Sequence, residues 1–235
     1  MAKPAYIELP GCEPIRILFE DRSALAIDKP RGWMLAPVGW QRTARNLQAA
    51  IESSIAAGDF WARSRGLKFL RHVHRLDADT SGVLLLAKRR GALAVFSRLF
   101  AGGQMEKIYL AVVAGEPRQT EWTCFLKLAP DETRRGRVKV DARRGKPAQT
   151  HFKILERRGN YSLVECRPVT GRTHQIRVHL AQAGLPIVGD PLYGRAEKNL
   201  PLALRAVRLA YTDPFTKKRV DIQAPSVGFL REFGF

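Results

Sequence analysis

Asp77 is the residue of this sequence whose neighbours best suit a carboxylate to chemistry. Basic residues precede it in Arg71-His72-Val73-His74-Arg75, and the small polar turn Thr80-Ser81-Gly82 follows it. A carboxylate beside arginines stays ionised, and a turn that contains glycine lets a ligand approach the backbone closely. Asp77 could therefore act on a bound ligand, or it could cap the turn or pair with Arg75. The residues around it leave both interpretations open.

The elements that must hold Asp77 follow from hydrophobic periodicity. Directly after the turn, Val83-Leu84-Leu85-Leu86-Ala87 is a continuous apolar run, which is typical of a buried central strand. Helices are expected from Leu47 to near Gly58, over 91–101 and over 173–183, and strands over 17–19, 24–27, 108–114, 121–128, 149–156, 161–167, 207–211 and 219–223. Strand pairs mixed irregularly with about three helices predict an α+β fold, a mainly antiparallel central sheet with flanking helices.

The helix expected over 173–183 combines an apolar stripe with basic residues. Ile176, Leu180 and Ala183 recur on one face at helical spacing, and His174 and Arg177 lie on the other side. This pattern predicts an amphipathic helix whose basic side chains lie opposite the core.

Length and composition are those of a globular protein. The 235 residues, 45% hydrophobic and 26% charged, suffice for one domain with a core that needs no disulfide or metal. No apolar run approaches the ~20 residues of a membrane-spanning helix, and residues 1–14 lack the apolar run of a secretory signal. Cys12, Cys124 and Cys166 show no paired spacing. We expect a cytoplasmic protein with reduced cysteines, no metal site and no membrane partner.

The charge of the chain points to a polyanionic partner. Its 40 basic residues, 28 arginines and 12 lysines, exceed its 22 acidic residues and give a formal net charge of +18. A field of this sign speeds the capture of a polyanion, and arginine can grip a phosphate in two places and stack on a base. A compositional bias towards arginine is the other explanation. Nucleic acid is therefore the expected partner.

The residues around Asp77 resemble the signature of RluA-type RNA pseudouridine synthases. That signature is His-Arg-Leu-Asp, two variable residues and Thr-Ser-Gly, and residues 74–82 match all seven fixed positions. Further stretches match in the family's order: Asp28-Lys29-Pro30 with Gly32, Lys107-Ile108-Tyr109-Leu110-Ala111, Thr170 to His179, and Pro186 to Gly194. The resemblance covers about residues 15–225. It implies the pseudouridine synthase fold with a central catalytic cleft.

The resemblance also implies a reaction. In this family a uridine of RNA is flipped into a pocket, detached from its ribose, turned and rejoined through carbon 5 without metal or cofactor. Asp77 would be the catalytic carboxylate, which either attacks the sugar or base covalently or removes a sugar proton. Arg177 would pair with Asp77 and keep it ionised. Tyr109 would stack on the uracil and relay the proton lost from carbon 5.

Other motif positions are expected to contact the RNA. They are His74, Arg75, Thr80, Lys107, Arg172, His174 and Gln175, with Leu204 as a wall of the pocket. One position departs from the family, because Leu204-Arg205-Ala206 stands where the family usually has Leu-His-Ala. The role of Arg205 stays open.

Two other chemistries fit the Asp77 region less well. Asp77-Ala78-Asp79-Thr80 resembles the Asp-x-Asp motif of haloacid-dehalogenase-type phosphatases, but threonine directly follows the second aspartate and the preceding residues are basic instead of apolar. His72 and His74 could ligate a metal from one strand face, although no third ligand lies near them in sequence. Contacts with phosphate or with the core suit these histidines better.

The main alternative function is a basic RNA-binding or ribosome-assembly protein of the same fold that has lost the reaction. It would use a basic ribbon that comprises Arg134, Arg135, Arg137, Lys139, Arg143, Arg144 and Lys146. A solvated hairpin explains the same residues. The presence of Asp77, Tyr109 and Arg177 favours the enzyme.

The resemblance and the charge lead to one overall hypothesis. We expect a monomeric pseudouridine synthase with an N-terminal extension over 1–14, a catalytic domain over 15–235 and no RNA-binding module of the S4 type. Its substrate would be a structured stem-loop of large-subunit ribosomal RNA or of transfer RNA, where loop bases are partly unstacked and cost less to flip. The sequence selects neither the RNA nor the uridine.

Overall fold

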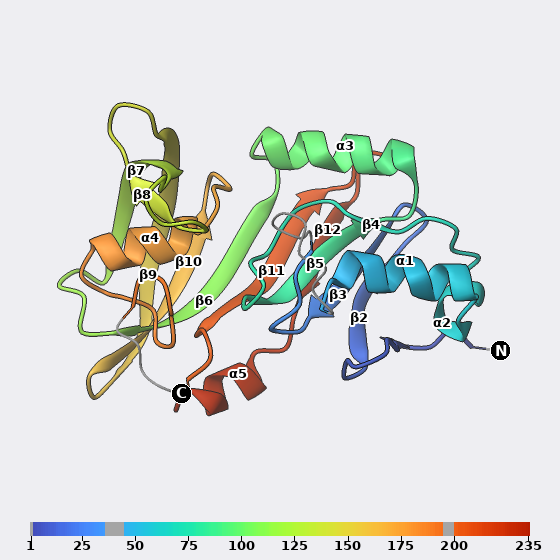
Figure 1. Ribbon diagram of the computed structural model, residues 1–235, viewed down its shortest axis with the longest axis horizontal. Helices are drawn as coiled ribbons and strands as arrows, with labels where there is room; N and C mark the ends of the chain where they lie inside the picture. Colours follow the sequence, from blue (N-terminus) through green and yellow to red (C-terminus); the bar gives the residue numbers. More distant parts are fainter. Residues whose placement is uncertain (1, 36–44, 195–199) are drawn as a thin grey trace. The chain divides into compact units, whose positions relative to one another are not determined.

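The computed structural model describes residues 2–35, 45–194 and 200–235, and the chain forms two compact units (Figure 1). The first unit contains the residues up to Met105 together with Leu209–Ala224, and the second contains Glu106–Arg208 and Pro225–Phe235. Each unit has its own buried hydrophobic cluster. The single catalytic domain expected over 15–235 stays a prediction.

The described part of the first unit consists of strands with three helices. Its strands are β1 (Tyr6–Ile7), β2 (Ile15–Glu20), β3 (Ala24–Lys29), β4 (Arg71–His72), β5 (Ser81–Ala87) and β12 (Arg219–Gln223). Strand β11 (Leu204–Thr212) belongs to this unit from Leu209 onward. The helices are α1 (Leu47–Ala57), α2 (Phe60–Arg63) and α3 (Arg90–Ala101). The strand order is β1-β2-β3-β5-β11, with β4 also on β5 and β12 on β11. The pairs β2–β3 and β3–β5 are antiparallel, which confirms the expected pairing of the first two apolar runs.

Strand β5 lies at the centre of the first unit, as its apolar run predicted. All seven of its residues are buried. Val83 and Leu85 share a hydrophobic cluster with Phe96 of α3 and Tyr211 of β11. A strand buried on both faces provides a rigid support for the loop that precedes it.

Helix α1 also follows its sequence pattern. The side chain of Asn46 caps its start by accepting a hydrogen bond from the N–H of Ala49, and Leu47 and Ile51 are buried. Gly58 ends the helix in the left-handed conformation, at the position predicted.

The second unit is a mainly antiparallel sheet with two helices among its described residues. Its elements are β6 (Glu106–Ala114), β7 (Glu121–Pro130), β8 (Val138–Val140), β9 (Lys146–Arg158), β10 (Tyr161–Pro168), α4 (Gln175–Gln182), α5 (Val227–Glu232) and the first part of β11. The order is β11-β6-β10-β9-β7-β8. The pairs β6–β10, β9–β10, β7–β9 and β7–β8 are antiparallel. The predicted α+β fold is confirmed.

Two details differ from the sequence-based expectations. Helix α4 is shorter than 173–183 and is buried on nearly all sides, so that Arg177 and His179 are buried while Ala183 lies beyond the helix and is exposed. The expected amphipathic face is therefore wrong, because Arg177 is neutralised by a partner inside the unit. The strands expected over 207–211 and 219–223 form and pair as β11 and β12, but a helix that was not expected, α5, follows them. Among the described residues, no helix has the length and apolarity needed to cross a membrane.

Candidate active site

Asp77 lies in the short loop that leads into β5. The N–H of Thr80 donates a hydrogen bond to the carbonyl oxygen of Asp77 (3.2 Å), which closes the loop as a turn. Thr80 is buried, whereas Asp77 is half-buried and Asp79 is exposed. The turn therefore places Asp77 directly before a rigid, buried strand.

Lys29, the last residue of β3, holds this loop from inside the unit. Its side chain is fully buried, and its Nζ donates hydrogen bonds to the carbonyl oxygens of Pro30 (3.0 Å), Ala78 (2.8 Å) and Thr80 (3.0 Å). Burial lowers the pKa of Lys29 to about 8, while the two carboxylates of the loop act in the opposite direction. Two of the three accepting carbonyls follow Asp77 within three residues, so Lys29 fixes the backbone that carries the carboxylate.

His72 and His74 are both engaged by groups of the first unit. The Nδ1 atom of His72 lies 2.8 Å from Oε1 of Gln48. The Nε2 atom of His74 accepts the N–H of Leu85 (3.1 Å), and its ring stacks on Phe100 with the ring centroids 4.4 Å apart. These contacts support core roles for the two histidines over metal ligation. Contact of His74 with RNA stays a prediction.

Gln175 organises the turn before α4 in the second unit. Its side chain is 4% exposed. Nε2 donates to the carbonyl oxygen of Gln149 (2.9 Å) and to Oγ1 of Thr150 (2.9 Å). Oε1 accepts from Oγ1 of Thr170 (2.7 Å) and from the N–H of Arg172 (3.0 Å). These four hydrogen bonds make Gln175 a scaffold of the turn, and its direct contact with RNA stays a prediction.

Two other expected RNA contacts, Lys107 and Arg172, lie at the same turn. Nζ of Lys107 donates to the carbonyl oxygen of Thr170 (3.3 Å), and burial lowers its pKa to about 8. Nε of Arg172 donates to the carbonyl oxygen of Pro147 (3.0 Å) at the start of β9. The fold thus brings together three of the residues that the sequence singled out, at one turn of the second unit.

Arg177 forms a buried ion pair with Asp190. Its Nε and Nη2 donate to Oδ2 (2.8 Å) and Oδ1 (2.7 Å) of the carboxylate, and the two side chains are 6% and 0% exposed. Burial by itself raises the pKa of Asp190, but the hydrogen bonds and charge of Arg177 lower it below its usual value. Asp190 therefore fixes the plane of the Arg177 guanidinium. Asp190 lies in the stretch from Pro186 to Gly194 that resembles the family, and the resemblance implied no role for it.

Tyr193 connects the expected RNA residue His174 with other parts of the second unit. Its hydroxyl oxygen lies 2.9 Å from Nδ1 of His174 and accepts the N–H of Val138 (2.7 Å). The guanidinium carbons of Arg137 and Arg177 lie 5.0 and 5.3 Å from the centre of its ring. His174 has a φ of 53°, a left-handed conformation that is uncommon outside glycine. Such strain is typical of functional positions.

The other expected residues differ in their surroundings. Tyr109 of β6 is half-buried and packs against the core of the second unit, whereas Arg75 is exposed in the first. Leu204 is buried, and Nε of the buried Arg205 donates to the carbonyl oxygen of Pro225 (3.0 Å). Arg205 therefore has a structural contact at the position where the sequence departs from the family.

The basic ribbon between 134 and 146 is largely exposed. Its members Arg134, Arg135, Lys139, Arg143, Arg144 and Lys146 are exposed, and Arg137 is half-buried. Asp131 and Asp141 shape the turns by accepting backbone N–H groups. The ribbon thus has a defined backbone and presents its cations to solvent.

A glycine next to Asp190 allows a close backbone approach. Gly189 has a φ of 69°, and a Cβ atom added to it would lie 2.1 Å from the carbonyl oxygen of Pro201. Gly184 has a similar φ of 76° with open space around it. Alanine at either position would cost ~1–2 kcal/mol because it must adopt the left-handed conformation. At position 189 its Cβ would also clash with the backbone of Pro201.

We therefore expect Gly189→Ala to lower the free energy of unfolding by about 1–3 kcal/mol more than Gly184→Ala does. Urea unfolding of the two variants measures the difference. Equal losses would show that the loop after Asp190 yields to the added methyl group.

The comparisons with known sequences agree with these motifs. Residues 24–182 match the sequence model of the RNA pseudouridylate synthase family. The chain is 34% identical to ribosomal large subunit pseudouridine synthase D of Zymomonas mobilis, over 95% of this chain and 73% of the relative. It is 38% identical to ribosomal large subunit pseudouridine synthase C of Salmonella typhimurium, over 92% of this chain and 67% of the relative. An uncharacterized RNA pseudouridine synthase of Zymomonas mobilis is 36% identical, over 94% of this chain and 97% of the relative.

Solved structures agree with the sequence relatives. Human RNA pseudouridylate synthase domain containing 1 aligns with a TM-score of 0.72 at 27% identity, over 92% of this chain and 85% of that chain. Human RNA pseudouridylate synthase domain containing 4 aligns with a TM-score of 0.73 at 21% identity, over 93% and 92% of the two chains, which supports the fold. The motif around Asp77, the family match and the structural similarity together show that the chain belongs to the RNA pseudouridylate synthase family.

Proposed function

We propose that this RNA pseudouridine synthase isomerises a uridine of large-subunit ribosomal RNA, with Asp77 as the catalytic carboxylate. Two of its relatives are named as ribosomal large subunit pseudouridine synthases, which supports the choice of RNA. The observation that carries the role of Asp77 is the loop itself. It lies within the region that matches the family, and Lys29 holds its backbone against β5.

The proposed reaction exchanges one bond of the nucleoside for another. The bond between N1 and the ribose breaks, a bond between carbon 5 and the ribose forms, and the proton lost from carbon 5 is balanced by one gained at nitrogen. Asp77 attacks the sugar or base, or removes a sugar proton. Following the family resemblance, Tyr109 stacks on the uracil and Arg177 keeps Asp77 ionised. A guanidinium has five N–H donors, so its pairing with Asp190 through two of them is compatible with this role.

The remaining properties belong to the same proposal. The enzyme acts in the cytoplasm as a monomer, and a structured stem-loop presents the target base. The isomerisation is redox-neutral and conserves every atom, which supports a reaction without metal or cofactor. The basic ribbon over 134–146 and the residues His74, Arg75, Thr80, Lys107, Arg172, His174, Gln175 and Leu204 form the proposed RNA-binding and pocket residues.

Mapping of pseudouridines in total RNA tests the choice of substrate. Cells of the native organism from which the gene has been deleted are expected to lose one or a few pseudouridines of large-subunit ribosomal RNA. A plasmid copy of the unchanged gene should restore them, and an Asp77→Asn copy should not. A loss confined to transfer RNA would replace the proposed substrate, and unchanged maps of both RNA classes would contradict the proposal.

A further inference from the structure

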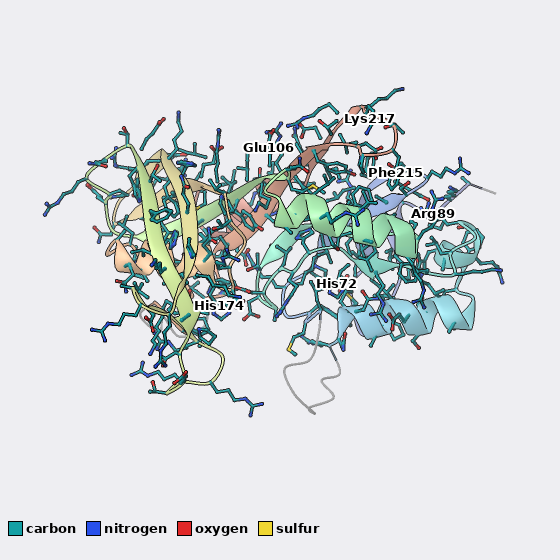
Figure 2. All side chains as sticks on the ribbon, turned by 90° about the horizontal axis from the view of Figure 1, so that it is seen from above. His72, Arg89, Glu106, His174, Phe215 and Lys217 are labelled. Carbon is teal, nitrogen blue, oxygen red and sulfur yellow. The ribbon has the colours of Figure 1, made fainter. Side chains whose placement is uncertain are left out.

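The first unit carries a groove that none of the roles above uses. It lies between α1, the segment that leads into β4, and α3, and has a volume of about 590 Å³. Volumes of a few hundred Å³ are typical of sites for small molecules or single nucleotides. Figure 2 shows His72, the residue after Arg71 of the groove, between these two helices.

The groove has a positive charge. Its cations are Lys68, Arg71 and Arg90, and its carboxylate is Glu52. Nη2 of Arg71 lies 3.0 Å from Oε1 of Glu52, but the two side chains are 51% and 46% exposed, so water screens the pair. With three cations and one carboxylate, the groove favours an anion such as a phosphodiester.

The groove also has an aromatic wall. Phe69 is half-buried, and the guanidinium carbon of Arg90 lies 5.8 Å from the centre of its ring. Ile55 of α1 and Leu93 of α3 extend the apolar surface. Bases of single-stranded RNA stack on aromatic rings and on guanidinium planes, and their phosphates bind nearby cations. Phe69 thus offers a ring on which a base can stack, and Arg90 offers a cation for a phosphate.

The walls of the groove are held in place before any ligand binds. Gln48 of α1 donates from Nε2 to the carbonyl oxygen of Leu70 (2.9 Å), and its Oε1 accepts the N–H of His72 (3.1 Å). These bonds attach α1 to the segment that carries Phe69 and Arg71. A preformed site loses less conformational entropy on binding.

We propose that this groove binds an unpaired nucleotide of the RNA substrate, with the base on Phe69 and the backbone phosphate at Lys68 and Arg90. The inference rests on the proposed function, because it takes the ligand to be part of the RNA. Asp77 lies six positions after Arg71, so their Cα atoms are within about 22 Å. A few nucleotides of single-stranded RNA span that distance, and the groove therefore holds RNA that flanks the target uridine.

The experiment measures binding of an unmodified large-subunit ribosomal RNA transcript to the full chain in the Asp77→Asn background, over a series of salt concentrations. Lys68→Glu and Arg90→Glu are expected to raise Kd about 10-fold at low salt and to reduce the salt dependence. Phe69→Ala is expected to raise Kd roughly 5- to 100-fold and to leave the salt dependence unchanged. A general loss of structure would not separate the two variant types in this way.

Arg98→Glu is the matched control. Arg98 lies on α3 like Arg90, is exposed, and does not line the groove, while its substitution changes the net charge equally. Equal effects of Arg98→Glu and the two groove charge reversals would overturn the inference. Competition by uridine monophosphate at the concentration of the RNA would also overturn it, because the groove would then hold a free nucleotide.

The design separates this inference from the proposed function. Binding is measured without turnover, so the groove variants give an answer even if the unchanged protein makes no pseudouridine in this RNA. The groove variants could bind the RNA as the Arg98→Glu control does while the unchanged protein still forms pseudouridine in it. That result would overturn the groove inference and leave the proposed function intact.

Discussion

An Asp77→Asn variant is expected to lose pseudouridine formation by on the order of 10³-fold or more and to bind RNA as tightly as the unchanged protein. Asparagine keeps the size of the side chain and removes the charge that either proposed route needs. The loop should keep its shape, because Lys29 Nζ donates hydrogen bonds to the backbone carbonyl oxygens of Ala78 and Thr80, and the substitution leaves these groups unchanged. Single-turnover assays and filter binding on the same RNA measure the two quantities.

Asp79→Asn is the control for this experiment. Asp79 lies two residues further on in the same loop and is exposed, so its substitution makes the same change of charge without touching the proposed catalytic group. It should keep most of the activity. Full activity of Asp77→Asn would refute the catalytic role, and an unchanged protein that binds RNA tightly without forming pseudouridine would favour the inactive RNA-binding alternative.

Asp190→Asn is expected to lower the free energy of unfolding by about 3–5 kcal/mol at neutral pH. The substitution removes the buried carboxylate charge to which Nε and Nη2 of Arg177 donate. Asparagine can still accept the backbone N–H groups of Leu192 and Tyr193 through its carbonyl oxygen, so the loss reports mainly on the ion pair. Urea unfolding measures it. Asp131→Asn, at a half-buried turn position of the same unit, should change the urea midpoint of unfolding only slightly.

The effect of Asp190→Asn should depend on pH in one direction. Because the pKa of Asp190 is lowered in the folded state, its stabilising contribution is complete above the unfolded pKa of about 4 and declines as the pH falls through the folded value. The unchanged protein should therefore approach the stability of the variant in acid. A difference that stays constant down to the folded pKa would show that the carboxylate charge does not stabilise the fold.

Local patterns in the sequence account for much of the fold. The apolar run of β5 predicted a buried strand, and the capped helix α1 ends at the glycine expected. Helix α4 did not follow its pattern, because the periodicity treated Arg177 as a solvent-facing residue. Its burial depends on Asp190, 13 residues later, and such a partner cannot be recognised from the spacing within one helix.

The site could be predicted where its residues are contiguous. The loop of Asp77 carries a compact signature, so its position before β5 followed from the sequence. The contacts of Lys29 with residues 49 and 51 positions away and the links of Tyr193 to Val138 and His174 join segments that only the fold brings together. The motif stretches that resemble the family already contained Lys29 and Tyr193, and that resemblance was the one signal that could have drawn attention to them.

The first unit combines the residues up to Met105 with the late segment Leu209–Ala224, and this affects when it can fold during synthesis. Its cluster around β5 includes Tyr211 and Ile222, which leave the ribosome more than a hundred residues after β5. A nascent chain that has reached Arg208 therefore still lacks part of the core around the strand that follows Asp77. Contacts between such distant residues form slowly because long loops must close first. The loop of Asp77 gains its complete support only when nearly the whole chain has been made, and no single cut of the chain divides the protein into its two units.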